Sequence, residues 1–191
     1  VETPGGEFDC PGDCAETLAH GTTITLQAVP AAGYLFSGWV DDTPGPIGAD
    51  CSDINPVYCT ITVTQARSLR AKFAPIYHTV TVSKTGSGVV ASQDGVIDCG
   101  KNCSGSFPTG TSLQLTATPD TGSSFSSWTG ACMGQGATCT LAISGPVSTE
   151  AVFTLNTYPV TVSFTGTAFG NVDTTNGAIA CRANGGNGCS A

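Results

Sequence analysis

The chain has 191 residues, with 14 acidic and only six basic side chains and a net charge of −8. This charge argues against binding nucleic acid or an anionic membrane surface through phosphate contacts. No apolar run approaches about 18 residues, so we expect no membrane insertion. Ten cysteines among 25 glycines and 11 prolines are typical of a disulfide-containing protein from an oxidising, extracellular compartment.

The sequence repeats itself. Residues 20–39, HGTTITLQAVPAAGYLFSGW, reappear as residues 109–128, TGTSLQLTATPDTGSSFSSW, at an offset of 89 residues with nine of twenty positions identical. A third copy opens with YPVTVSFTG from Tyr158, which matches VTVSKTG from Val80. Such periods indicate tandem repeats, here of about 80–89 residues. The predicted parts are repeat 1 without its first strand (1–75), a complete repeat 2 (76–155) and the start of repeat 3 (156–191).

Short segments in which apolar and polar residues alternate are separated by Gly- and Pro-rich turns. This period of two predicts β-strands, and no segment has a helical period. In repeat 1 the predicted strands are residues 22–29, 35–39, 59–64 and 68–74. In repeat 2 they are residues 78–84, 88–92, 111–118, 124–128, 138–143 and 147–154. The predicted fold is all-β, with each repeat a β-grasp-like sheet or a small sandwich.

Aromatic residues recur at equivalent positions of the two repeats. We expect them in the repeat cores, because each follows the same strand pattern. They are Phe36, Trp39, Phe73, Phe125, Trp128 and Phe153. The alternative for the two tryptophans is an exposed platform for a sugar ring. Very short connectors between the repeats predict limited hinge motion and a semi-rigid rod.

The cysteines lie in local pairs, and the third copy contains only the first pair. Pairing within each local pair leaves no cysteine unmatched, and each such small loop contributes about 2 kcal/mol. The predicted disulfides are Cys10–Cys14, Cys51–Cys59, Cys99–Cys103, Cys132–Cys139 and Cys181–Cys189. The alternative is a four-cysteine zinc site in each repeat, which is disfavoured because the spacing lacks the usual C-x2-C knuckles.

No catalytic or cofactor-binding residue is predicted. His20 and His78 do not recur between the repeats, and the serines lack a G-x-S-x-G elbow. Repeat 1 has an insertion of about ten residues after Trp39. Its acidic residues could hold calcium, although their spacing matches no calcium loop and a solvated acidic loop is the favoured interpretation. These residues are Asp41, Asp42, Asp50 and Asp53.

The repeat pattern resembles the divergent internalin B-type repeat of bacterial surface and secreted proteins. In repeat 2 the match consists of Val80, Thr81, Val82, Gly86, Gly88, Cys99, Cys103, Gly110, Leu115, Ala117, Pro119, Phe125, Trp128, Cys132, Cys139 and Phe153. The resemblance implies a small all-β or β-grasp-like unit, used in tandem in stalks, adhesins and accessory regions. It implies neither catalytic residues nor a cofactor.

The expected function is therefore a non-enzymatic structural or adhesive segment of an extracellular or cell-surface bacterial protein. The alternative is a glycan- or protein-binding module of a secreted hydrolase. Two interpretations of the third copy stay open: a window from a longer array, or a strand that completes repeat 1 of the next subunit. In the second case self-association uses a trans-pairing strand with Tyr158, Val160, Val162 and Phe164.

Overall fold

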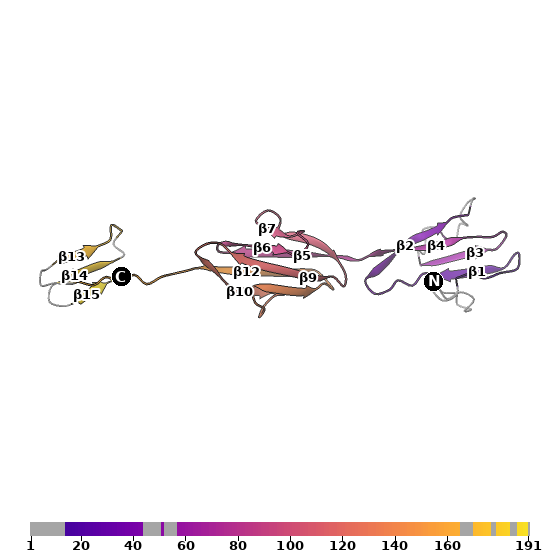
Figure 1. The fold of residues 1–191 in the computed structure, drawn as a ribbon. Helices are drawn as coiled ribbons and strands as arrows, with labels where there is room; N and C mark the ends of the chain where they lie inside the picture. The colour runs from indigo at the N-terminus through magenta and orange to yellow at the C-terminus, as the bar shows by residue number, and fades with distance from the viewer. Residues whose placement is uncertain are drawn as a thin grey trace. The chain divides into compact units, whose positions relative to one another are not determined.

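The computed structural model describes residues 14–43, 51, 57–164, 170–176, 179–183 and 187–190. The chain divides into two compact units, Val1–Leu155 and Asn156–Ala191. All regular elements of the described residues are strands, which confirms the all-β prediction (Figure 1). In the described part of the chain, no helix has the length and apolarity needed to cross a membrane.

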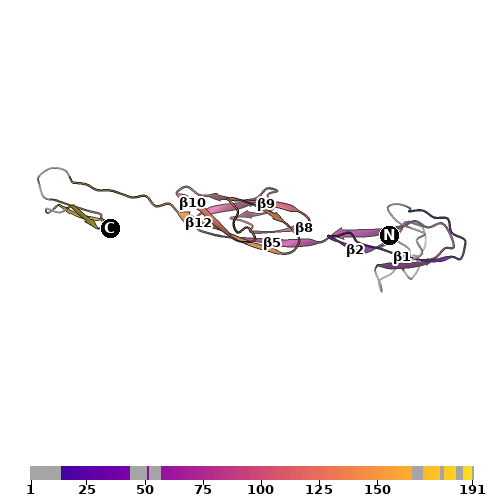
Figure 2. The same cartoon turned by 90° about the horizontal axis from the view of Figure 1, so that it is seen from below.

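Repeat 2 is a sandwich of two four-stranded sheets (Figures 1 and 2). One sheet has the order β10-β12-β5-β8 and the other β11-β9-β6-β7. The strands are β5 (Tyr77–Thr85), β6 (Gly88–Ser92), β7 (Asp98–Cys99), β8 (Ser104–Pro108), β9 (Ser112–Pro119), β10 (Ser123–Gly130), β11 (Thr138–Ala142) and β12 (Val147–Leu155). Of the two architectures predicted, the small sandwich is the one observed.

Alternating residues of both sheets point inward and form one core. In β9, for example, Leu113, Leu115 and Ala117 are buried while their neighbours are exposed. The other core residues lie on the remaining strands and turns of both sheets. They are Val80, Val82, Val90, Ile97, Cys99, Phe107, Trp128, Cys132, Cys139, Leu141, Ile143, Ala151 and Phe153. Because the period-two pattern matches the pleat, the strands direct most of their apolar side chains to the inner face.

The first and last strands of repeat 2 lie side by side and run parallel. In this β5–β12 pair, Val80 faces Val147 and Thr85 faces Val152. Every other strand pairing in the described residues is antiparallel. β12 is therefore bonded on both edges, to β10 on one side and to β5 on the other.

The structure adds two strands to the six predicted for repeat 2. β7 has only two residues, and β8 carries a single large apolar side chain, Phe107. Neither segment has an apolar alternation long enough to be recognised. They are held instead by pairing with β6 and β5, which is a tertiary effect.

Repeat 1 contains two separate pairs of strands: β1 (Thr23–Gln27) with β3 (Tyr58–Thr62), and β2 (Tyr34–Asp41) with β4 (Leu69–Pro75). These are the equivalents of β9 with β11 and of β10 with β12. The registers agree, and the same irregularity occurs after Phe36 and after Phe125. A small core cluster is formed by Leu26, Cys59 and Ile61.

The second unit contains a three-stranded antiparallel sheet of β13 (Gly170–Asp173), β14 (Ala180–Ala183) and β15 (Asn187–Ser190). Val172 faces Cys181, as Val90 faces Cys99 in the β6–β7 hairpin of repeat 2. The hydroxyl of Thr174 also accepts a bond from the Ile179 N–H, as Ser92 does from Ile97. The third copy thus reproduces the β6–β7 hairpin of repeat 2.

Residues 156–164, which lead into that sheet, form no strand, although a strand is predicted from Tyr158. The equivalent strand in repeat 2, β5, is bonded to both β12 and β8. Among the described strands, no ladder of this kind includes residues 156–164.

Candidate functional site

The two repeats contain the same aromatic cluster in nearly the same geometry. The ring centroids of Phe36 and Trp39 are 5.5 Å apart, and those of Phe36 and Phe73 are 5.8 Å apart. The equivalent distances in repeat 2 are 5.7 Å for Phe125 and Trp128 and 6.1 Å for Phe125 and Phe153. The strands of repeat 1 therefore position these side chains as those of repeat 2 do.

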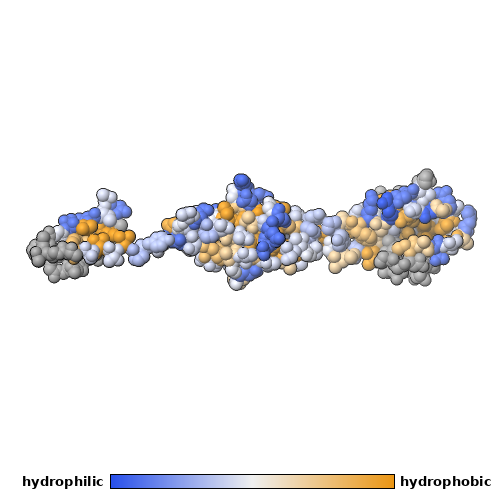
Figure 3. Space-filling view, in the orientation of Figure 1, coloured by the Kyte–Doolittle hydropathy of each residue, from blue (hydrophilic) through white to orange (hydrophobic). Residues whose placement is uncertain are grey.

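The two clusters differ in how well they are covered. Phe153 is 4% exposed and Trp128 is 2% exposed, whereas Phe73 is 39% exposed and Trp39 is half-buried. The prediction that Phe73 lies in the core is wrong for this structure. In repeat 2, β5 and the following turn cover this site, and no equivalent strand is present among the described residues of repeat 1. Apolar surface is visible on repeat 1 in Figure 3.

A cavity of about 700 Å³ lies between the two strand pairs of repeat 1. We call it the repeat 1 groove. Its apolar wall comes from β1, β2, β3 and the beginning of β4, and its rim comes from the segment before β1 and the turn before β4. The lining residues are Cys14, Ala15, Glu16, Thr17, Leu18, His20, Ile24, Leu26, Trp39, Ile61, Val63, Thr64, Gln65, Ala66, Arg67, Ser68 and Leu69.

The indole nitrogens of the two tryptophans also differ. Trp128 donates a hydrogen bond from Nε1 to the carbonyl of Gly136, at 2.8 Å. Trp39 Nε1 is buried without an acceptor among the described residues. The position equivalent to Gly136 falls between Cys51 and Cys59, in residues 52–56, outside the described part of the chain.

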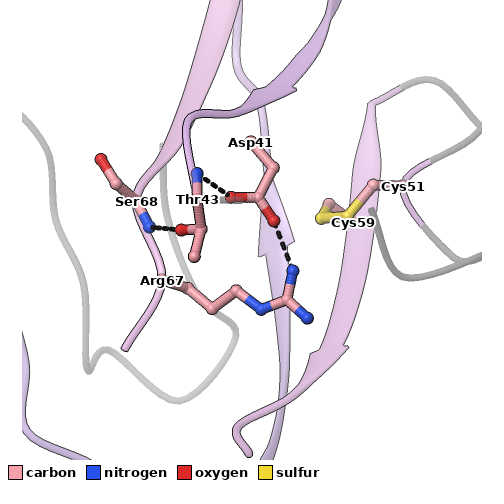
Figure 4. A network of polar contacts seen from close by, with 6 residues as sticks. All are labelled: Asp41, Thr43, Cys51, Cys59, Arg67 and Ser68. Carbon is pink, nitrogen blue, oxygen red and sulfur yellow. Dashed lines mark hydrogen bonds and ion pairs between the residues drawn. A yellow bond between two sulfur atoms is a disulfide. The ribbon is translucent and has the colours of Figure 1, made fainter. Parts of the chain in front are cut away.

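A network of polar contacts includes two residues that line the groove, Arg67 and Ser68 (Figure 4). Asp41 accepts bonds from the Thr43 backbone N–H at 2.8 Å and from Arg67 Nη1 at 2.5 Å, and Thr43 Oγ1 accepts one from the Ser68 N–H at 2.9 Å. The Thr43 N–H lowers the pKa of Asp41, and the Arg67 guanidinium acts in the same direction, against the effect of burial.

Its neighbour Asp42 binds Arg70 through both carboxylate oxygens, at 2.6 Å each. This contact lowers the pKa of Asp42 and raises that of Arg70. Two of the four acidic residues considered for calcium are thus paired with arginines. Asp50 and Asp53 lie outside the described residues, and no group of three potential metal ligands occurs within the described ranges.

Three disulfides join neighbouring segments: Cys51–Cys59, Cys99–Cys103 and Cys132–Cys139. Cys14 is also disulfide-bonded, and Cys10 lies outside the described residues. Cys181 is disulfide-bonded and lies opposite Cys189 in the β14–β15 ladder. No described cysteine is free.

The two histidines, for which no catalytic role is predicted, have different surroundings. His20 lines the repeat 1 groove. His78, in β5, contacts the Thr109 hydroxyl through Nε2 at 2.9 Å, and that hydroxyl is 3.2 Å from the carbonyl of Ile76. The groove was not predicted from the sequence, because its walls come from strands whose pairing the pattern does not specify.

Comparison with known proteins gives a match to one family model. Neither the curated proteins nor the solved structures contain a significant match to this chain. The model of one family, described as the divergent InlB B-repeat domain, matches residues 2–77 and again residues 78–157. These two tandem matches cover most of the sequence and agree with the repeated strand registers. The chain belongs to the divergent InlB B-repeat domain family.

Proposed function

We propose that this chain is a non-enzymatic structural and adhesive segment of an exported bacterial surface protein or extracellular filament. Its copies would be joined head to tail by strand addition. Support comes from the tandem family repeats and from the disulfides, which are stable in an extracellular setting.

The observation that carries this proposal is the junction between the two repeats. β4 ends at Pro75 and β5 begins at Tyr77, so only Ile76 separates the strands. The N–H of Ile76 donates to the carbonyl of Gly33 at 2.8 Å, and its carbonyl accepts from the Thr109 N–H at 2.8 Å. A connector with both backbone groups bonded has little freedom, which suits a segment that transmits force or spaces other parts of a surface protein.

The alternative function, glycan binding through exposed tryptophans, has less support. Trp128 is buried and its indole nitrogen is already bonded. Trp39 packs against Phe36 within the repeat 1 cluster. An aromatic platform for a sugar needs an accessible ring face, and neither position presents a fully exposed one.

The test is a strain of the source organism in which these residues are replaced by an unrelated disulfide-bonded β-domain of similar length. We expect antibodies against the repeats to label intact wild-type cells, and attachment to surfaces or to other cells to fall in the replacement strain. Labelling only after permeabilisation, or unchanged attachment, would contradict the proposal.

A further inference from the structure

We propose that the repeat 1 groove binds residues 158–164 of a second copy of this chain as a strand parallel to β4. We call these residues the donor segment. This inference rests on the proposed function and identifies the partner and the contact surface of its self-association.

In repeat 2 the equivalent site is already occupied, by β5. Val80 and Val82 are 0% and 2% exposed and pack into the core of the sandwich. The core wall around them includes Leu113, Leu115, Trp128 and Leu141, which correspond to Ile24, Leu26, Trp39 and Ile61 in the repeat 1 groove. The groove thus has the wall that a V-T-V strand requires, with that strand absent from the described residues.

The donor segment has the matching sequence. Residues 160–163, Val-Thr-Val-Ser, are identical to residues 80–83 of β5. Tyr158 and Val160 are 77% and 72% exposed. Large apolar side chains at such exposure in β-branched sequence favour burial against another strand.

The edge of β4 offers the backbone partners. Its equivalent, β12, pairs with β10 on one edge and with β5 on the other, whereas β4 pairs only with β2 among the described residues. Strand addition to such an edge supplies main-chain hydrogen bonds together with pockets for alternate side chains.

The register follows from repeat 2. Thr81 of β5 faces Ser148 of β12, and Ser148 corresponds to Ser68 at an offset of 80 residues. Thr161 of the donor therefore faces Ser68. Val160 and Val162, on the opposite face of the strand, then point into the groove beside Trp39 and Leu69.

The donor also contacts a second neighbour. β5 pairs on its other edge with β8, whose equivalents in repeat 1 are residues 15–19. These residues line the groove but form no strand. Insertion of the donor would place it beside this segment as β5 lies beside β8, with Leu18 in the position of Phe107.

The donor must come from another copy because its own chain is too short to reach. β5 follows Ile76, and β12 runs parallel to it, so Leu155 lies at the end of β12 remote from repeat 1. The strand spans roughly 26 Å from that end back to the junction at about 3.3 Å per residue. The five residues from Leu155 to Val160 span at most about 18 Å.

The first experiment measures the molar mass of the 191-residue chain by light scattering over a range of concentrations. We expect the wild-type chain to form oligomers whose size rises with concentration. Val160→Asp places a charge in the groove and should leave only monomers. Thr161→Asp is the matched control, because the equivalent Thr81 is exposed, and it should assemble as the wild type does.

A second experiment tests the register with two chains that can cross-link only in trans. One carries Ser68→Cys with Val160→Asp, so it accepts but does not donate, and the other carries Thr161→Cys. We expect an intermolecular disulfide, detected by mass under non-reducing conditions. Lys72→Cys in place of Ser68→Cys moves the acceptor thiol by four residues, about 13 Å, and should give none.

Each outcome decides the inference. A wild-type chain that stays monomeric overturns it, as does assembly of Val160→Asp at wild-type strength. In the latter case the copies associate through another surface, and the donor segment is not what joins them. Cross-linking at Lys72 instead of Ser68 overturns the register. These results decide whether copies are joined head to tail, whereas the role at the cell surface is decided separately, by cell labelling and attachment.

Discussion

Two close approaches in repeat 2 involve Gly86, in the turn between β5 and β6, and Gly88, the first residue of β6. A Cβ atom added at Gly86, where φ is +81°, would lie 2.1 Å from the carbonyl oxygen of Phe153. At Gly88 it would lie 2.6 Å from the ring of Phe153. Only glycine therefore lets this turn lie against β12, and this contact is part of what covers the aromatic cluster.

We predict that Gly86→Ala destabilises repeat 2 by about 2–4 kcal/mol, because overpacking adds to the cost of a positive φ. The control is Gly95→Ala. Gly95 also has a positive φ, +74°, but no atom lies within 4 Å of the added Cβ, so the loss should be about 1 kcal/mol. Urea denaturation measures both, and equal losses would contradict the packing argument.

The network around Asp41 predicts acid sensitivity of repeat 1. Its folded-state pKa is lowered from 3.8, so the carboxylate stabilises the folded state fully at pH values well above 3.8. This contribution decreases as the pH falls through 3.8 and is lost below the folded-state pKa. Asp41→Asn should reduce stability near neutral pH and make the loss on acidification shallower. Urea midpoints between about pH 6 and pH 3 measure this, and an unchanged slope would contradict it.

The burial of a side chain was predictable from the sequence where the local strand pattern alone determines it. Trp128 and Phe153 follow a strand alternation and are buried. Phe73 follows the same alternation but is exposed, because its burial depends on a strand that comes from elsewhere. The ion pairs of Asp41 and Asp42, at the end of β2 and just after it, reach residues more than 20 positions away, and no local pattern indicates them.

At the level of elements, β5 accounts for most of the difference between the repeats. It contributes Val80 and Val82 to the core and bonds the edges of both β12 and β8. Most strand positions of the two repeats were predictable because these strands have a period-two pattern bounded by turns, whereas β7 and β8 lack one. The parallel pairing of β5 with β12 was not predictable, since periodicity gives the faces of a strand but not its neighbours.

Hydrogen exchange should reveal this difference directly. In the monomeric Val160→Asp chain, we predict faster amide exchange in β4 than in β12, because β12 is bonded on both edges. Wild-type assembly should then protect β4 and residues 15–19. Peptide-resolved exchange monitored by mass spectrometry measures both effects. Equal protection of β4 and β12 in the monomer would show that repeat 1 needs no further strand.

At the scale of the whole molecule, the sequence predicted the tandem organisation and the disulfide-containing all-β class. The repeated motif made this possible, because the same strands and the same aromatic cluster recur in both copies. The groove could not be predicted in the same way. Two strand pairs with equal sequence patterns are covered by β5 in repeat 2, and no described strand covers them in repeat 1.

The parallel pairing of β5 and β12 has a mechanical consequence. When repeat 2 is pulled at Tyr77 and Leu155, the two strands slide past each other, and the whole ladder from Val80–Val147 to Thr85–Val152 is loaded in shear at once. Handles at Ser123 and Leu155, which face each other at one end of the β10–β12 pair, would instead open the bonds one after another. Optical-tweezers pulling should give a severalfold higher unfolding force in the first geometry, and equal forces would contradict this prediction.

A donor strand bound parallel to β4 would place the same geometry between two molecules. Tension along the assembly would then shear a full ladder at each joint instead of peeling it from one end. A non-covalent contact of this kind resists rupture under fast pulling far better than its equilibrium affinity suggests. Assembled copies would therefore hold together under brief, strong tension even at concentrations at which they dissociate at equilibrium.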